Sequence, residues 1–202
     1  MKIAVLGATG MAGSRIVAEA LARGHEVTAI ARKPEGLANH AALTRVAADV
    51  AAPGLAELLR GHDAVVSALH FQTLGEPALA SALKAAGVRR VLIVGGAGSL
   101  EVAPGVLLVD TPEFPAEWKP FARPGVDFLQ QLRAESELDW TFISPSAFFE
   151  PGARTGVFRL GGDQLLVGAD GRSAISAEDY AVALLDEIEK PAHIRMRMTV
   201  GY

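Results

Sequence analysis

The chain has 202 residues, half of them hydrophobic and about a fifth charged, which is the composition of one folded domain with a large core. Its formal net charge of −4 argues against a general nucleic-acid surface, and the absence of cysteine excludes a disulfide framework, thiol catalysis and cysteine metal sites. No apolar run is long enough for a membrane span and no signal-peptide region precedes the first glycines, so we expect a cytoplasmic protein without a membrane partner.

The first stretch, Lys2 to Arg15, predicts a buried strand that runs into a glycine-rich turn and a helix. Gly7, Gly10 and Gly13 follow the apolar strand with GxxGxxG spacing. Glycines at this place allow a sharp turn, the approach of a pyrophosphate to main-chain N–H groups, and close packing of helix on strand. A tight turn without a ligand is the structural alternative. No GxxxxGK[ST] sequence occurs, so a dinucleotide site is favoured over a nucleoside triphosphate site.

The rest of the chain alternates predicted strands and helices. Strands are expected at Glu26–Ala31, Leu43–Ala47, Ala64–Ala68, Arg90–Val94, Asp139–Ser144 and Arg195–Val200, and helices at Gly10–Arg23, Leu55–Arg60, Leu74–Ala86, from about Val126, and at Ile175–Glu189 with Ser176 as N-cap. Such alternation implies parallel pairing with right-handed crossovers. The fold class is therefore α/β: a single doubly wound Rossmann-type domain, residues 1–202, with helices on both faces of a mainly parallel sheet.

Two segments are expected to form the substrate side, at about residues 96–125 and 145–175. Five prolines between residues 104 and 124 are expected to break any long regular element, which makes the first segment a loop region. In the second, a hairpin from Val157 to Val167 is expected to cover the site, and residues 150–154 are expected to close over it as a turn.

The end of the second strand indicates which nicotinamide cofactor is bound. Proteins that prefer NAD usually carry Asp or Glu there for the ribose 2′-hydroxyl, whereas this chain has Arg32 and Lys33. These cations suit a 2′-phosphate, so NADP is favoured over NAD; solvated loop charges are the alternative. Asp49 and Val50, after the third strand, are expected beside the adenine, and Asp49 is equally consistent with the start of a surface turn.

Five short motifs, spread over almost the whole chain, form a more specific set than the glycines alone. They are GATGMAG at 7–13, SAL at 67–69, GGAGSL at 95–100, DWT at 139–141 leading to SPS at 144–146, and DYAVA at 179–183. In this order they resemble atypical short-chain dehydrogenases/reductases of the NmrA-like group, which includes NADH-flavin reductases and the biliverdin reductase B type flavin reductases.

The resemblance implies where the cofactor lies. The turn after the first strand would hold the pyrophosphate, the segment 67–69 would pass near the cofactor, and the segment from Pro145 would meet the nicotinamide. The implied cofactor contacts are Gly7, Thr9, Gly10, Met11, Gly13, Ala68, Leu69 and Pro145.

One departure from that family pattern bears on the chemistry. Ketone-reducing short-chain dehydrogenases use a Tyr acid with a Lys four residues later, and no YxxxK occurs here: Tyr180 has Leu184 at that offset. Flavin or quinone reduction needs a positioned plane more than a strong acid. We therefore expect an NAD(P)H-dependent reductase of a flavin, quinone or similar planar acceptor. The alternative is a non-catalytic NADP(H)-sensing NmrA-like regulator.

The acceptor side offers several candidate residues. Ser99 lies where the broader family keeps a serine near the substrate, and is the candidate catalytic residue; a turn or helix-cap serine is the alternative. His70 and Phe148 are the candidate acceptor contacts, with a structural histidine and a core phenylalanine as alternatives. Other aromatic material for a stacking pocket is Phe71, Phe114, Trp118 and Phe149. A metal site is not indicated, and a monomer or a homodimer is expected.

Overall fold

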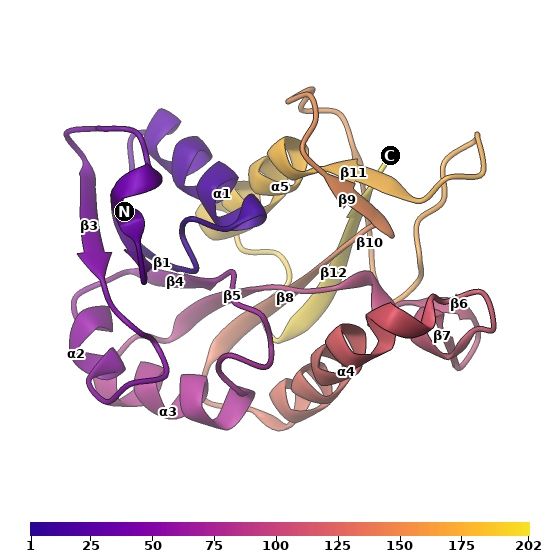
Figure 1. Cartoon of the computed structure of the whole chain (residues 1–202), viewed down its shortest axis with the longest axis horizontal. Helices are drawn as coiled ribbons and strands as arrows, with labels where there is room; N and C mark the ends of the chain where they lie inside the picture. Colours follow the sequence, from indigo (N-terminus) through magenta and orange to yellow (C-terminus); the bar gives the residue numbers. More distant parts are fainter.

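The chain is built around one eight-stranded sheet, and a computed structural model describes all 202 residues (Figure 1). The helices are α1 (Met11–Ala22), α2 (Leu55–Leu59), α3 (Glu76–Ala86), α4 (Lys119–Ala134) and α5 (Ala177–Glu189). Single 3-10 turns are η1 (Pro34–Gly36), η2 (Ala97–Ser99), η3 (Leu108–Asp110) and η4 (Ala116–Trp118). The strands are β1 (Lys2–Leu6), β2 (Glu26–Ala31), β3 (Leu43–Ala47), β4 (Ala64–Ser67), β5 (Arg90–Val94), β6 (Glu101–Ala103), β7 (Val106–Leu107), β8 (Asp139–Pro145), β9 (Phe148–Glu150), β10 (Arg159–Gly161), β11 (Ala174–Ser176) and β12 (Met196–Gly201).

The order of the strands creates a crevice at the carboxyl ends of β1 and β4. The sheet runs β10-β12-β8-β5-β4-β1-β2-β3, and all neighbours pair in parallel except β10, which pairs antiparallel with β12. From β1 the chain proceeds to β2 and β3 at one edge and then returns to β4 on the other side of β1. Ligands of open α/β sheets bind at such a switch point. The predicted Rossmann-type fold with a mainly parallel sheet is confirmed.

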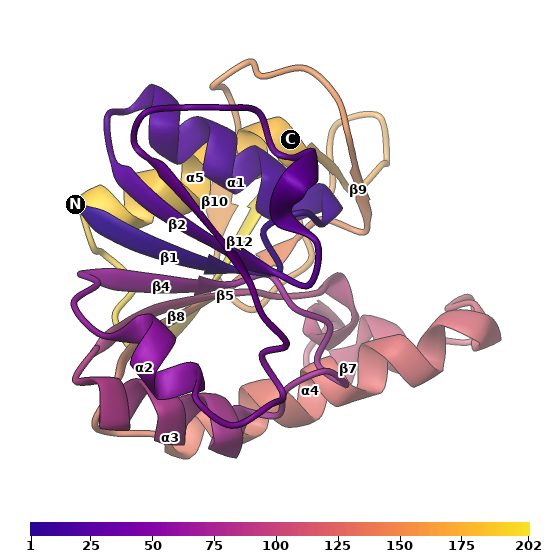
Figure 2. The ribbon, with the colours of Figure 1, turned by 60° about the vertical axis from the view of Figure 1, so that its left-hand side comes forward.

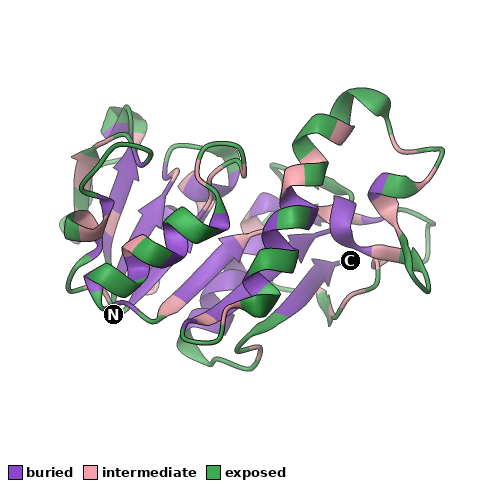
Figure 3. Ribbon diagram, turned by 90° about the horizontal axis from the view of Figure 1, so that it is seen from below, coloured by how far each residue is buried: buried purple, intermediate pink, exposed green.

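Helices cover both faces of the sheet, α1 and α5 on one and α2, α3 and α4 on the other (Figure 2). Strand β1 shows why this arrangement is stable: Ile3 and Val5 enter the core under α1 and α5, whereas Ala4 and Leu6 enter the opposite core. Alternate residues of a strand point to opposite faces, so a run of apolar residues needs cover on both sides. The buried strands lie between helices whose outer faces are exposed (Figure 3).

Helix α4 begins earlier than the sequence predicts. The prolines were expected to delay it to about Val126, but it starts at Lys119, with Pro120 in its first turn and Pro124 inside it. Pro124 has no N–H to donate to the carbonyl of Pro120. The side-chain amide of Gln72 donates to that carbonyl at 2.9 Å instead, so the missing helix bond is replaced from another segment. The region before α4 also contains the small β6–β7 hairpin.

The prediction of a hairpin between Val157 and Val167 is also wrong. Only β10 forms there, and its partner is β12, so this segment extends the main sheet by one short edge strand. The N-cap of α5 is as predicted: the Ser176 hydroxyl accepts the backbone N–H of Asp179 at 3.0 Å. None of the helices is long and apolar enough to cross a membrane.

A buried ion pair at the amino ends of β5 and β8 provides a test of this packing. Arg90 donates to the Glu187 carboxylate of α5 at 3.1 Å and to the Thr141 hydroxyl at 2.7 Å, and the Glu187 side chain is only 3% exposed. Arg90→Met leaves that carboxylate without its guanidinium partner. We expect the free energy of unfolding, measured by urea titration, to fall by about 3 kcal/mol.

The matched control is Arg89→Met. Its guanidinium is 66% exposed and pairs with Asp139 at 3.2 Å, so removing it is expected to cost less than about 1 kcal/mol. Equal losses for the two variants would contradict the assignment of Arg90 to a buried pair.

Candidate functional site

The glycine turn has the backbone geometry of an anion site. Gly7 adopts φ +74°, and a Cβ on it would lie 2.5 Å from the Ala68 carbonyl oxygen. A Cβ on Gly13 would fall inside van der Waals contact of the Gly7 carbonyl oxygen, and one on Gly10 would lie 3.3 Å from the same atom. Only glycine permits the approach at Gly7 and Gly13.

The N-terminus of α1 has no side-chain cap. Gly10 is its N-cap, no acidic residue lies in its first turn, and Thr9 and Met11 beside it are exposed. The first N–H groups of a helix lack partners within the helix, and the helix dipole makes this end positive. Together these features suit an anion such as a pyrophosphate.

The end of β4 forms the other wall of the crevice. The Ala68 N–H donates to the Leu6 carbonyl at 2.9 Å, which holds the end of β4 beside the end of β1. Leu69 reaches the same turn, since its Cδ2 would lie 3.3 Å from a Cβ on Gly7. The structure thus brings together Gly7, Ala68 and Leu69, which the resemblance assigns to one cofactor site. Their contact with a cofactor stays a prediction.

Arg32 and Lys33 follow β2 directly and are both exposed, without an ion-pair partner. They lie near the glycine turn because the N–H of Gly7 donates to the Ile30 carbonyl at 3.0 Å. Asp49 is exposed and accepts the N–H of Ala51 at 3.0 Å, a contact typical of a surface turn. Val50 is buried in the core under α2. The geometry leaves the cations free for a ligand and favours a local role for Asp49.

The aromatic residues of the expected stacking pocket divide between core and surface. Phe71 packs on Phe128 with ring centroids 5.1 Å apart, and Phe149 packs on Tyr180 at 4.8 Å, so both belong to the interior. Phe148 points away from the core, opposite to Phe149, and is 52% exposed. The Arg172 guanidinium lies 5.2 Å from the centroid of the Phe148 ring.

His70 is exposed at the end of β4, and its ring makes no hydrogen bond within the protein. Phe148 and His70 therefore remain the accessible candidates for an acceptor. Trp118 and Phe121 form a further exposed pair near the start of α4.

Ser99 is buried rather than open to the crevice. Its hydroxyl accepts from the Arg197 guanidinium at 3.1 Å, and its carbonyl accepts from the same group at 2.8 Å. These contacts match the structural alternative for Ser99, and its catalytic role stays a prediction. Pro145 is buried at the end of β8.

Tyr180 cannot donate a proton to a ligand. It is completely buried in α5, and its hydroxyl donates to the Ile143 carbonyl at 2.7 Å. Burial raises the pKa of the Tyr180 hydroxyl well above its ordinary value. The missing YxxxK pair is therefore not replaced by this tyrosine.

A strap, residues 151–157, crosses α1 and α5 after β9. The Arg154 guanidinium donates twice to the Glu19 carboxylate of α1, at 2.8 Å each. Asp179 accepts from the backbone N–H groups of Thr155 and Gly156 at 2.7 and 2.8 Å. The sequence predicted a turn here but not its anchors, because Glu19 and Asp179 are distant in the chain and read as ordinary helix residues.

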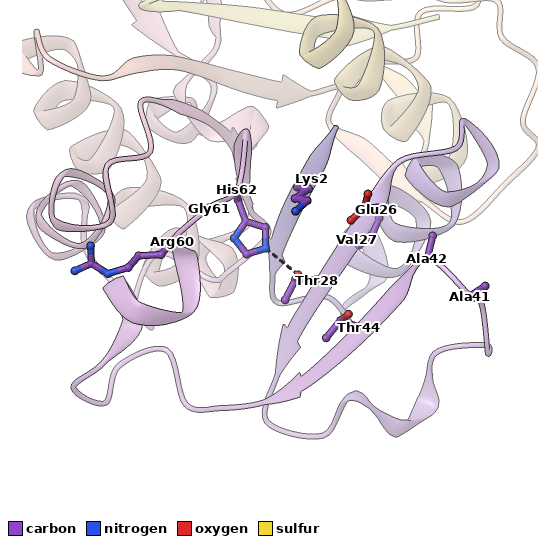
Figure 4. Close-up of a pocket in the computed structure, with 10 residues that line it drawn as sticks. All are labelled: Lys2, Glu26, Val27, Thr28, Ala41, Ala42, Thr44, Arg60, Gly61 and His62. Atoms are coloured by element: carbon purple, nitrogen blue, oxygen red, sulfur yellow. Dashed lines mark hydrogen bonds between the residues drawn. The ribbon is translucent and has the colours of Figure 1, made fainter.

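A cavity lies away from the glycine turn. It measures about 640 Å³ and opens at the amino ends of β1 and β2, where His62 Nε2 lies 2.8 Å from Thr28 Oγ1 (Figure 4). The switch-point crevice lies at the carboxyl ends of the same strands. This cavity contains none of the residues that the sequence assigns to a cofactor.

Replacing Gly13 tests the glycine turn. Gly13→Ala forces its methyl group against the Gly7 carbonyl, so we expect NADPH affinity, measured by cofactor fluorescence, to fall at least about tenfold, equivalent to about 1.4 kcal/mol. Gly162→Ala is the matched control, since a Cβ there would meet no atom within 4 Å. Unchanged affinity in a folded Gly13→Ala protein would refute this geometry.

The strap predicts a pH effect. Hydrogen bonds from Arg154, which contributes most, and from Arg23 lower the pKa of Glu19 from 4.5 to about 2. A carboxyl whose pKa is lower in the folded state stabilises the fold above pH 4.5 and loses that contribution as pH falls toward 2. Glu19→Gln should therefore lower stability at pH 7 and flatten its decline below pH 4.5, measured by urea unfolding. The exposed pair Glu57–Arg60 gives the control, and Glu57→Gln should change this pH slope much less, because solvent screens the pair. An unaltered slope in Glu19→Gln would refute the role of this pair.

Comparisons with known proteins show the family of the chain. A family model described as NAD(P)H-binding matches residues 7–191. Three solved structures are similar over 100% of this chain: a candidate exported protein from Burkholderia pseudomallei (47% identical, TM-score 0.90, 100% of that chain), a candidate epimerase from Bacteroides thetaiotaomicron (42%, 0.95, 96%) and a candidate NADH-flavin reductase from Streptococcus pneumoniae (38%, 0.89, 99%). With its glycine turn at the switch point of a Rossmann-type sheet, the chain belongs to the NAD(P)H-binding family, within the atypical short-chain dehydrogenases/reductases of the NmrA-like group.

Proposed function

We propose that the protein is an NAD(P)H-dependent reductase that transfers hydride directly to a flavin, a quinone or a similar planar acceptor. The observation that carries the proposal is a crevice at the switch point of the sheet, in a chain whose Tyr180 is buried and bonded to main chain. A site without a poised acid suits an acceptor that takes hydride on a conjugated ring and a proton from water. The similar protein from S. pneumoniae, described as a candidate NADH-flavin reductase, supports the same function.

The protein's part in this reaction is binding and orientation. The N–H groups at the start of α1 would hold the pyrophosphate, with Gly7 and Gly13 allowing its approach, and the segment from Pro145 would border the nicotinamide. The reduced nicotinamide supplies the hydride. Phe148, exposed beside this segment, would offer its ring to the acceptor plane, and His70 would line the opposite wall from β4. Positioning two rings in contact is enough to accelerate such a transfer.

We further propose that NADP is preferred over NAD. Arg32 and Lys33 are exposed after β2 and unpaired, so a 2′-phosphate can engage them without breaking an existing ion pair. Asp49 and Val50 stay predicted adenine contacts, although the Asp49 carboxylate accepts a hydrogen bond within a surface turn and Val50 is buried under α2.

An NADP(H)-sensing regulator without turnover is the second candidate, because the absent Tyr/Lys pair fits a binding protein as well as a reductase. The epimerase from B. thetaiotaomicron suggests a third, but epimerases of this fold generally use the Tyr/Lys pair, which this chain lacks. The relative from B. pseudomallei described as exported contrasts with the expected cytoplasmic location. Location and the monomeric or dimeric state stay predictions.

Oxidation of NADPH at 340 nm with FMN, FAD, riboflavin and simple quinones tests the function. Turnover with at least one acceptor is expected, with a lower KM for NADPH than for NADH. Arg32→Ala should raise the KM for NADPH about tenfold, or 1.4 kcal/mol, with kcat little changed, because the lost contact binds ground state and transition state alike.

The control is NADH, whose KM should not respond to Arg32→Ala because it has no 2′-phosphate. Ser99→Ala in the same assay tests the structural alternative: an unchanged kcat makes Ser99 a structural serine, whereas a lower kcat is expected both of a catalytic residue and of one that holds Arg197. NADPH binding without turnover on any acceptor would overturn the reductase and favour the sensor.

A further inference from the structure

A buried arginine on the outer part of the sheet, Arg197 of β12, lies behind the expected acceptor side. Its side chain is only 3% exposed, although arginine is seldom buried unless it is paired. Its Nε donates to the Asp163 carboxylate at 2.7 Å, its Nη2 also contacts that carboxylate, and its Nη1 donates to Ser99 as described above. This guanidinium thus connects β12 to two further segments that are far apart in the sequence.

The first of these segments is the turn after β5, residues 95–99. It begins beside the end of β8, where the Gly95 N–H donates to the Ile143 carbonyl at 2.8 Å, two residues before Pro145. A Cβ on Gly96 would meet no atom within 4 Å, so this part of the turn faces open space. A Cβ on Gly98 would lie 2.9 Å from Ala122 of α4, so the far end of the turn is packed. The turn therefore has one packed end and one free side.

The second segment contains Asp163. Its carbonyl accepts the N–H of Glu101 at 2.9 Å, and the N–H of Leu165 donates to the Glu101 carbonyl at 2.9 Å. The Thr199 hydroxyl of β12 donates to the Gly162 carbonyl at 2.5 Å. Arg197 and Thr199 lie on one face of β12 and together fix residues 162–163, which in turn fix the chain directly after Ser99.

We propose that Arg197 is a positioning residue for the acceptor side: its guanidinium holds the turn 95–99 and the segment 162–165 in one arrangement beside Pro145. The proposal rests on the proposed function, because hydride transfer requires a fixed wall against which the acceptor lies. The cofactor turn after β1 has its own supports at Ala68 and Ile30, so its geometry is independent of Arg197.

Variants of Arg197 and Arg90 distinguish a role in positioning the acceptor side from a role in stability. Arg197→Met removes a charge whose partner is not stranded, because the Asp163 side chain is 46% exposed and still pairs with Arg133 at 2.8 Å. Arg90→Met, near the opposite end of β5, deprives the deeply buried Glu187 of its guanidinium partner and leaves it with His193 and two backbone N–H groups. Arg90→Met should be the less stable of the two, and Arg197→Met the less active.

The experiment compares wild type with Arg197→Met, Arg197→Lys and Arg90→Met. For each protein it measures the kcat and the KM for the acceptor, the Kd of NADPH, the melting temperature and amide hydrogen exchange. For Arg197→Met we expect a kcat at least about tenfold lower, equivalent to about 1.4 kcal/mol, with a Kd for NADPH within about twofold of wild type. Exchange in residues 95–101 should be about tenfold faster, while exchange in residues 3–17 should be unchanged. Arg197→Lys, which keeps the charge but not the fork, should restore part of the kcat. Arg90→Met, assayed where it is folded, should keep its kcat.

An unchanged kcat and unchanged exchange in Arg197→Met would overturn the proposal, and so would equal losses of kcat in Arg197→Met and Arg90→Met. A wild-type protein without turnover would refute the reductase alone. In that case the exchange of residues 95–101 still decides the positioning role: faster exchange in Arg197→Met supports it, and unchanged exchange overturns it.

Discussion

The close approach of the β1 turn to the end of β4 is the constraint on which the rest of the site depends. A Cβ on Gly7 would lie 2.5 Å from the Ala68 carbonyl oxygen, so the two ends meet with no room for a side chain. This contact fixes the start of α1 above the sheet and leaves its N–H groups facing the crevice. The switch point of the sheet lies at the same place, because β2 and β4 lie on opposite sides of β1. The glycine turn therefore lies where open α/β sheets bind their ligands.

The positively charged side chains around the glycine turn differ in their exposure. Arg32 and Lys33 at the β2 end are exposed and unpaired, whereas the arginines farther from the glycine turn, Arg90 and Arg197, are buried and paired with carboxylates. Buried guanidinium groups lose hydration and need partners within the protein, so each of the two holds its partner segment in place, although Nε of Arg90 has no hydrogen-bond partner. Free cations can serve a ligand, and buried cations determine the shape of the protein around it.

Local patterns in the sequence predicted the features that depend on local physics. The glycine spacing, the apolar strands and the Ser176–Asp179 cap each act within a few residues, and the structure has them where the pattern indicates. Helix α4 was predicted to begin too late because the carbonyl freed by Pro124 is satisfied by Gln72, 48 residues away. The partner of β10 and the anchors of Arg197 were equally invisible, since an arginine in an apolar strand does not indicate which distant carboxylate it meets.

The positions of β1 and β4 also have a consequence for how the protein folds. The parallel pair at the centre of the sheet joins Ile3 to Ala64, so the chain between them must first close a long loop around β2, β3 and α2. Closing such loops is entropically costly, and folds rich in distant pairings form more slowly than those with local contacts. A chain still emerging from the ribosome can make the glycine turn but not the opposing wall until β4 has appeared. Cofactor binding thereby becomes a late event in synthesis, and cofactor in the cell stabilises only chains whose central strands have already paired.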